Sequence, residues 1–199
     1  EGNLPSGDLG LHYRAGFGNG RHANIARAGD AGDINGDKAW MVQIGAKPRN
    51  VQGLDIGAGL YSDEITLPGI PTIEETTLSL HAALTRERPE VIVEYFHSEH
   101  DAVGGASGEV DAWYAQFAYR LKGDRSAWKP YARIEKTDVD DLDPLLGGSG
   151  LDYDASVLGL RWDFNAYAAL KGEYRNEEFA NAGRENNFRL QLSFVLTGL

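Results

Sequence analysis

The feature that most constrains this chain is the alternation of apolar and charged side chains within residues 158–175, LGLRWDFNAYAALKGEYR. Successive side chains of a β-strand point to opposite faces of its sheet. Leu160 and Trp162 therefore share one face of a predicted strand, whereas Arg161 and Asp163 share the other. The charged face needs water, so the apolar face must contact either a protein core or lipid.

The same alternation recurs along the whole chain, and the i, i+3, i+4 spacing of a helix is not sustained in any segment. The alternating segments are rich in aromatic and branched residues and are bounded by Gly, Pro, Asn or Asp. The sequence therefore predicts an all-β, antiparallel up-and-down barrel of about ten strands that forms one domain over residues 1–199. The predicted strands are 9–17, 39–47, 53–62, 76–85, 91–98, 112–121, 128–136, 154–164, 167–175 and 188–196.

Composition excludes several classes of protein. The 199 residues carry a net charge of −11, which argues against a nucleic-acid-binding surface. The chain has no cysteine, which excludes disulfides and thiolate metal sites. Mean hydropathy is −0.40, and no segment approaches the ~18 consecutive apolar residues of a transmembrane helix. A transmembrane β-barrel stays open as an interpretation, because its strands alternate and its loops are polar.

The predicted connections alternate between long and short. The long ones are 18–38, 63–75, 99–111, 137–153 and 176–187, and the short ones are 48–52, 86–90, 122–127 and 165–166. In an up-and-down meander, all the long connections then lie at one end of the strands and all the short ones at the other. This sorting is typical of outer-membrane barrels, whereas a Greek-key sandwich has no reason to produce it.

The distribution of aromatic residues favours lipid as the contact of the apolar face. A soluble lipocalin-like barrel would bury this face instead. The face carries charge only near strand ends, at Asp154 and Lys136, and its aromatic residues gather in two groups around an aliphatic band, as in a membrane barrel. The groups are Phe17, Trp40, Tyr95, Trp113, Tyr174 and Phe188 at one end, and Tyr119, Trp128, Trp162, Phe164 and Phe194 at the other. We expect ten residues to point into lipid: Leu11, Val42, Ile56, Leu80, Val93, Phe117, Ile134, Leu160, Leu170 and Leu192.

A family resemblance accompanies this pattern. The segment GLRWDFNAYAALKGEYR and the terminal strand NNFRLQLSFVL resemble the end of Gram-negative general or phosphate-selective porins. The stretch LPSGDLGLHYRAGFGNGR resembles an internal strand of such porins, although the chain starts abruptly at EGNLPSGDLG without a signal peptide. The resemblance implies a water-filled β-barrel in the cell outer membrane.

Two points bear on how much of a porin this chain represents. Larger members of the family have about 16–18 strands, so the chain is either a ten-stranded barrel or the C-terminal part of a larger one, and its internal-looking start favours the second. Many outer-membrane proteins end on an aromatic residue, but here the chain continues past Phe194 to Leu199. The usual assembly signal is therefore altered.

The inward face should carry the function of such a barrel. It holds nine basic and five acidic side chains, including Asp55 and Glu94, which is a surplus of four positive charges. The residues assigned to the pore are Arg14, Lys47, Arg120, Lys129, Arg133, Glu135, Arg161, Asp163, Lys171, Glu173, Arg175 and Arg189. We expect the channel to prefer anions, and Arg120 and Arg189 to bind phosphate-like groups because they lack an acidic neighbour. Alternatively, the charges form a ladder of ion pairs, for example between Arg133 and Glu135.

Motifs for other chemistry are weak. The segment DINGDK, residues 33–38, starts like a calcium loop but holds Lys38 at the sixth position, where an EF-hand needs Gly. An acidic loop that merely tolerates a divalent ion stays open there. The acidic run DVDDLD, residues 138–143, is expected to be a solvated loop. HSEHD, residues 97–101, offers zinc ligands or a His–Asp hydrolytic pair. We assign no catalytic residue, no metal and no cofactor.

The sequence therefore predicts an outer-membrane porin that forms a diffusion channel for small hydrophilic, preferentially anionic, solutes. Inward glycines such as Gly53, Gly57 and Gly59 leave space for a channel. The expected partners are outer-membrane lipid and lipopolysaccharide, together with the solute; nucleic acid is excluded, and a homo-oligomer is compatible with the pattern. The alternative is a structural, adhesive or enzymatic barrel, for example a surface hydrolase.

Overall fold

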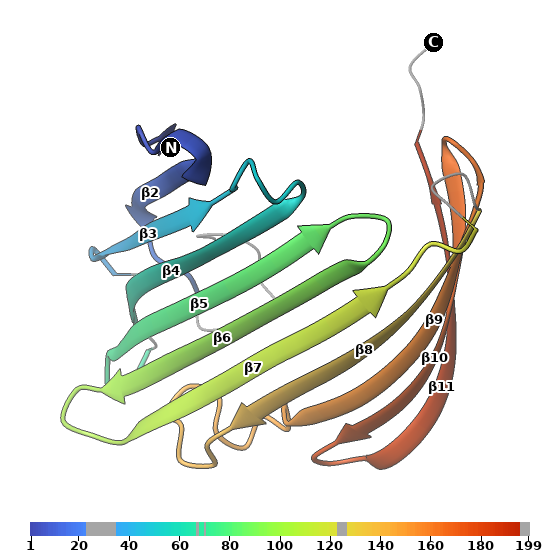
Figure 1. The fold of residues 1–199 in the computed structure, drawn as a ribbon. Helices are drawn as coiled ribbons and strands as arrows, with labels where there is room; N and C mark the ends of the chain where they lie inside the picture. The colour runs from blue at the N-terminus through green and yellow to red at the C-terminus, as the bar shows by residue number, and fades with distance from the viewer. Residues whose placement is uncertain (23–34, 67, 70, 123–126, 196–199) are drawn as a thin grey trace.

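The protein is a single curled sheet of eleven antiparallel strands in sequence order (Figure 1). The computed structural model describes residues 1–22, 35–66, 68–69, 71–122 and 127–195. Among these, Gly7–Leu9 forms a short 3-10 turn, and no helix is long and apolar enough to cross a membrane. The predicted all-β, antiparallel, up-and-down arrangement is confirmed.

Each of the ten predicted strands corresponds to one observed strand, and a two-residue strand precedes them. The strands are β1 (Gly2–Asn3), β2 (Leu11–Asn19), β3 (Lys38–Ala46), β4 (Leu54–Ile65), β5 (Ile73–Thr85), β6 (Glu90–Ala102), β7 (Ser107–Ala118), β8 (Trp128–Val139), β9 (Tyr153–Asn165), β10 (Ala168–Phe179) and β11 (Gly183–Phe194). Pairing of β1 with β2 at Tyr13 and His12 was not predicted.

The strands extend further than predicted at one end of the sheet. The predicted connections 99–111 and 176–187 consist largely of strand, and strands enter 63–75 from both ends, so the predicted boundaries there are wrong. The physical reason is that both faces are polar at this end, as in Glu74 and Glu75 of β5. Alternating hydrophobicity therefore ends several residues before the backbone pairing does.

The predicted sorting of long and short connections holds only in part. The turns 103–106 and 180–182 are tight, although long loops were expected there, whereas 140–152 remains long. Some of the predicted features fall partly outside the described residues: the connection 18–38 with the DINGDK segment, the turn 122–127, and the end of the last predicted strand at residue 196.

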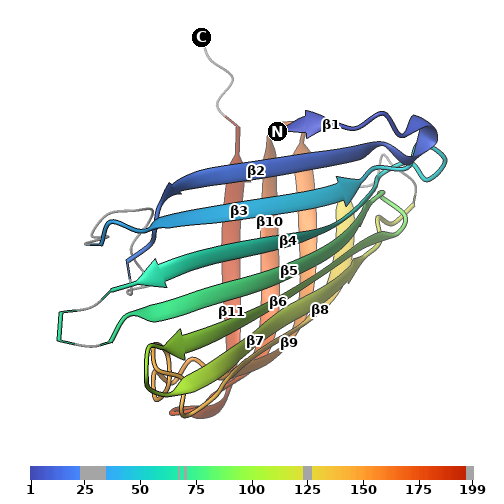
Figure 2. The ribbon, with the colours of Figure 1, turned by 90° about the vertical axis from the view of Figure 1, so that its left-hand side faces the viewer.

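The sheet curls so that β2–β6 lie across a hollow from β9–β11 (Figures 1 and 2). One face of every strand lines this concave side, and the other forms the convex side. The small buried cluster of Ala118, Tyr131 and Val157 lies on the concave face. The described residues thus form one layer, without a second sheet or a helix packed against it.

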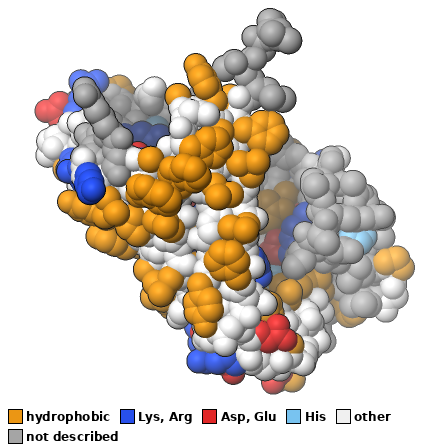
Figure 3. Space-filling model, turned by 90° about the vertical axis from the view of Figure 1, so that its right-hand side faces the viewer, with side chains coloured by type: hydrophobic (Ala, Val, Ile, Leu, Met, Phe, Trp, Pro, Cys, Tyr) orange, Lys and Arg blue, Asp and Glu red, His pale blue; other side chains and the backbone are white. Residues whose placement is uncertain are grey.

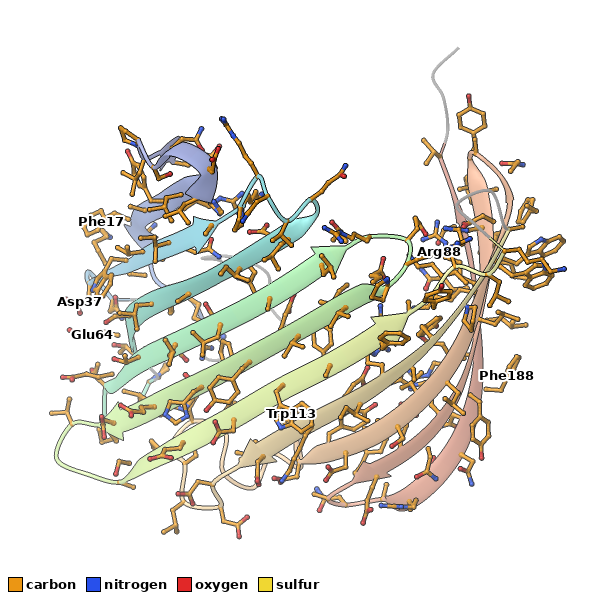
Figure 4. All side chains as sticks on the ribbon, in the orientation of Figure 1. Phe17, Asp37, Glu64, Arg88, Trp113 and Phe188 are labelled. Carbon is orange, nitrogen blue, oxygen red and sulfur yellow. The ribbon has the colours of Figure 1, made fainter. Side chains whose placement is uncertain are left out.

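The convex face is apolar and exposed. Of the ten residues predicted to point outward, eight are exposed, among them Phe117 at 52%, Ile134 at 48% and Leu192 at 59%; Leu11 and Leu170 are partly exposed. They do not pack against one another in a core. Hydrophobic side chains gather on the convex side of β9–β11 (Figure 3), and Phe188 and Phe17 lie on the outside of the curve (Figure 4).

Both long edges of the sheet are open. β11 pairs only with β10, and β2 pairs with β3 along its length and with β1 over two residues. No ladder between the neighbourhoods of Leu11 and Leu192 is present among the described strands, so these eleven strands do not close on themselves.

Candidate functional site: the concave face

The residues assigned to a pore share the concave face. Their positions in the strand register place all of them on this face, or directly past a strand end in the case of Lys47 and Arg120. They do not form one cluster, because Arg14 and Lys47 lie near the N-terminal edge and the others on or beside β8–β11. At the N-terminal edge, Arg14 pairs with Glu1 at 3.2 Å and Lys47 with Asp55 at 3.2 Å.

Ion pairs fill the concave wall formed by β8–β11, which we call the paired wall. Its centre is Arg175, only 4% exposed. Its guanidinium donates to Glu135 at 2.8 Å, to Glu173 at 3.1 Å and to Glu177 at 2.6 Å. Around this centre lie further pairs: Arg133 with Glu135 and Glu173, Lys171 with Glu173, and Arg189 with Glu177.

A second cluster closes the turn end of this wall. Arg120 Nε donates to Glu87 at 2.5 Å, and its Nη1 lies 2.8 Å from Asp163, which also pairs with Arg161. Lys129 lies 2.7 Å from Glu90 and 3.3 Å from Glu87. The hydrogen bond from Arg120 lowers the pKa of Glu87 below its usual value, so this carboxylate stays ionised beside two cations.

These contacts correct the expectation for Arg120 and Arg189. Both were predicted to lack an acidic neighbour, and both have one: Glu87 and Asp163 for Arg120, and Glu177 for Arg189. These partners could not be identified from the sequence, because they come from a turn and from other strands rather than from positions two residues away from each arginine. The alternative expectation, a ladder of ion pairs, describes the paired wall.

The expected surplus of positive charge also disappears. The longer strands add Asp63, Glu75, Glu90, Glu177 and Glu185 to the concave face, and Arg21 packs against it. Nine basic and five acidic side chains thus become ten of each, and Glu1 and Glu87, which pair with Arg14 and Arg120 beyond the strand ends, add two further acids. The prediction of an anion path along unpaired arginines loses its electrostatic basis.

The opposite wall, on β3–β6, is different. It borders a cavity of about 660 Å³, which also contacts residues of β7, β8 and the 140–152 loop. Most of its lining side chains are uncharged, among them Gly59, Ser79 and Thr77, and the charged ones include Arg21 and Glu75. Thr77 Oγ1 and Ser98 Oγ hydrogen-bond to each other at 2.9 Å. Of the inward glycines predicted to leave space, Gly59 lines the cavity, whereas Gly53 lies in the preceding turn with φ of 80°.

A buried polar network holds the 140–152 loop over this cavity. His100 is 1% exposed, and its Nδ1 lies 2.6 Å from Asp143 of the loop while its Nε2 lies 2.8 Å from Glu75. Ionised carboxylates only accept hydrogen bonds, so the ring donates from both nitrogens. Arg21 Nε also donates to Glu75, at 2.9 Å. The network ties two distant segments of the chain to the wall.

Sequence reasoning missed this network. Asp143 belongs to the acidic run expected to be solvated, and that expectation is wrong for this residue, which is buried. A glycine makes the burial feasible: a Cβ on Gly108 would lie 2.3 Å from Asp143 Cα. The signal was His100 itself, because a histidine in a strand next to carboxylates needs partners.

The HSEHD segment is divided between the two faces of β6. Ser98 and His100 point into the hollow, and His97, Glu99 and Asp101 lie on the convex face. The segment is therefore neither a loop nor one cluster. His12 and His81 lie on the concave face and flank Asp55, with their Nε2 atoms 3.9 and 3.6 Å from its Oδ1.

A comparison with protein-family models and with curated protein sequences finds no match for this chain. The resemblance to porins therefore rests on the residues of this chain, and its function has to be argued from the two faces of the sheet.

Proposed function

We propose that this chain forms part of an outer-membrane porin, with the convex face against lipid and the concave face lining a water-filled diffusion channel for small hydrophilic solutes. The observation that carries the proposal is the contrast between the faces: exposed aliphatic and aromatic side chains cover the convex face, and charges, hydroxyls and glycines cover the concave one.

The convex face is unlike the surface of a soluble monomer, which rarely exposes a contiguous apolar patch above a few hundred Å². Its aromatic residues lie on both sides of the aliphatic residues: Trp128 at the start of β8 on one side, and the paired Tyr95 and Trp113, at the middle of β6 and β7, on the other. This arrangement suits the two interfaces of a bilayer, where amphipathic rings are favoured. The partners of this face would be outer-membrane lipid and lipopolysaccharide.

The apolar band supports the proposal by its direction. It does not follow the rows of paired residues but crosses them obliquely. One row runs through Leu11, Ala46, Ile56, Ala82, Val93, Ala115, Ile134, Ser156, Asn176 and Asn186. It begins on an apolar residue and ends on an asparagine, because the apolar residues of β11 lie further along, at 188–194. Strands that are tilted across a membrane require this offset.

The open edges fit part of a larger barrel. In lipid, an unpaired strand edge leaves backbone groups without hydrogen bonds, at several kcal/mol each. β1 and β11 run in the same direction, since ten antiparallel steps separate them. An odd number of further strands would therefore close the sheet with antiparallel neighbours throughout, which gives the even total of bacterial barrels.

The concave face argues for weak ionic selectivity. The charges on this face nearly cancel and are mostly paired. Low-dielectric walls strengthen the effect of fixed charges on a permeating ion, but here there is little net charge to strengthen. We therefore propose a channel for small hydrophilic solutes of either sign in place of the anion preference expected from the sequence.

Conductance in a planar lipid bilayer tests this function. The purified protein should produce discrete current steps that grow in proportion to salt concentration, as a water-filled pore does. A protein that folds and inserts but gives no steps would instead favour the alternative of a structural barrel, whose interior is filled by a polar network such as the paired wall.

Neighbouring substitutions in β3 test the orientation. Val42→Arg should destabilise the bilayer-inserted protein by about 2–4 kcal/mol, because it places a charge in the apolar band. Gln43→Arg is the matched control, since this side chain points to the concave face. Denaturant titration in lipid vesicles measures both. Equal costs for the two variants would contradict the assignment of the faces.

A further inference from the structure

From the convex face of β6 and β7 we infer a binding site for a divalent transition-metal ion, formed by His97, Glu109 and Asp111. Their ligand atoms all lie within 4.8 Å of one another. The site lies on the convex face at the polar end of β6 and β7, beyond the apolar residues proposed to contact lipid, and does not depend on the proposed channel. Trp113, two residues along β7, marks its place in Figure 4.

The strand register builds the site. His97 pairs directly with Asp111, and Glu99 pairs with Glu109 in the next position on the same face. Directly opposite side chains in an antiparallel pair have Cβ atoms about 4.5–5.5 Å apart. The sequences H-x-E on β6 and E-x-D on β7 therefore bring one imidazole and three carboxylates together on rigid elements.

Asp111 is already oriented for this role. Its Oδ1 accepts a hydrogen bond from the Tyr95 hydroxyl at 2.5 Å and lies 3.1 Å from His97 Nδ1. The rings of Tyr95 and His97 stack with their planes at 10°. Such contacts to the ligands of a metal fix their geometry and commonly change metal affinity about 10–100-fold.

Glu109 is the one member of the proposed site whose carboxylate has no ion-pair partner among the described residues. Its carboxylate has no hydrogen bond or ion pair with any residue that the structure describes. Lys136, which pairs with Trp113 in the register of β7 and β8, is itself paired with Asp138 at 3.1 Å. Glu109 therefore leaves negative charge uncompensated beside His97 and Asp111.

The ligand types select the class of metal. Ligands of one zinc ion lie about 2.0–2.2 Å from the metal, so the three groups have to draw closer together around an ion, and Glu109 is exposed and free to move. An imidazole favours zinc, copper or nickel over calcium and magnesium, which prefer oxygen ligands alone. Three protein ligands leave a coordination position open to water or to an external anion.

Titration of Zn²⁺ into the folded protein, followed by calorimetry, tests the inference. One ion should bind per chain. His97→Ala and Glu109→Gln should each weaken binding by about tenfold or more, and Tyr95→Phe, which keeps the ring and removes the hydroxyl, by about tenfold. The matched controls are His81→Ala on the concave face and Glu178→Gln at another position on the convex face, and both should bind as the unmodified protein does.

Three results would overturn the site. They are absence of stoichiometric Zn²⁺ binding by the folded protein, equal affinity for Ca²⁺ and Zn²⁺ with no effect of His97→Ala, and loss of binding in the control variants. Circular dichroism of each variant separates loss of the site from loss of the sheet, and Glu109→Gln should leave the sheet intact because its carboxylate has no partner to lose. Loss of conductance alone would leave the metal site standing, since the two faces are tested separately.

Discussion

The two walls of the concave face are built from the same kind of strand but filled in opposite ways. On the paired wall, long charged side chains of β8–β11 reach across neighbouring strands, and Arg175 contacts three carboxylates at once. On β3–β6, glycines and hydroxyl residues line much of a cavity, and its charged side chains are confined to one network, in which Glu75 and His100 of the wall meet Arg21 and Asp143 of the loop.

The difference shows how one sheet combines rigidity with open space. Ion pairs that are buried together constrain each other, because removing one partner leaves a charge without compensation. The cavity wall has this constraint only at the network of Glu75 and His100, which holds the 140–152 loop over the cavity. If the sheet encloses a channel, the paired wall fixes its shape and the cavity wall with its loop sets the free space.

The largest expected effect comes from breaking the paired wall at its centre. Arg175→Met leaves Glu135, Glu173 and Glu177 without their shared cation, and we expect a loss of about 3–5 kcal/mol in the free energy of unfolding. Denaturant titration measures this loss. Arg161→Met is the control and should cost under about 1 kcal/mol, because its side chain is half exposed and Asp163 keeps Arg120. Equal costs would mean that the network does not act as a unit.

A smaller effect is expected at the cavity wall. Gly108→Ala places a methyl group against the Asp143 backbone, so the 140–152 loop has to move, at about 1–3 kcal/mol. Limited proteolysis should then cut the loop faster, while the paired wall keeps its stability. Gly18→Ala is the control, since no atom lies within 4 Å of its added methyl group. Unchanged proteolysis of Gly108→Ala would contradict the role given to this glycine.

The smallest effect is expected at the turn end of the paired wall, where a substitution should change the ion selectivity of the channel rather than the stability of the sheet. Glu87→Gln removes one negative charge beside Arg120 and Lys129, so the reversal potential across a salt gradient should shift toward anions. Glu178→Gln is the control, because its carboxylate pairs with Arg184 on the convex face. A shift toward cations, or an equal shift in both variants, would show that Glu87 does not face the conducting path.

Acidification should have the same effect on the reversal potential as Glu87→Gln, but at a lower pH than an ordinary glutamate would require. Because Arg120 lowers the pKa of Glu87, the carboxylate stays ionised where an ordinary glutamate is already protonated. The stability that this pair contributes is present above the unfolded pKa and is lost as pH falls through the lowered folded pKa. The shift of the reversal potential that arises from Glu87 should therefore require more acid than the usual glutamate range.

The sequence predicted the strands well wherever one face is apolar. In β9 and β10 the alternation identifies both strands and their faces, because each side chain has a choice between water and an apolar surface. It failed at the polar end, where Glu74 and Glu75 give no contrast between faces although the backbone remains paired. The paired residues Glu177 and Glu75 were missed for this reason, since both lay in predicted loops.

By itself, the sequence determined the fold class, the order of the strands and the polarity of each face, because a period of two is a local property that a single strand expresses. The tertiary structure decided which charges meet. The contacts of Arg120 with Glu87 and Asp163, of His100 with Asp143, and of Asp111 with Tyr95 and His97 depend on register, curl and loop packing. These arise from pairing between distant segments, and no local pattern encodes the distance between two side chains on different strands.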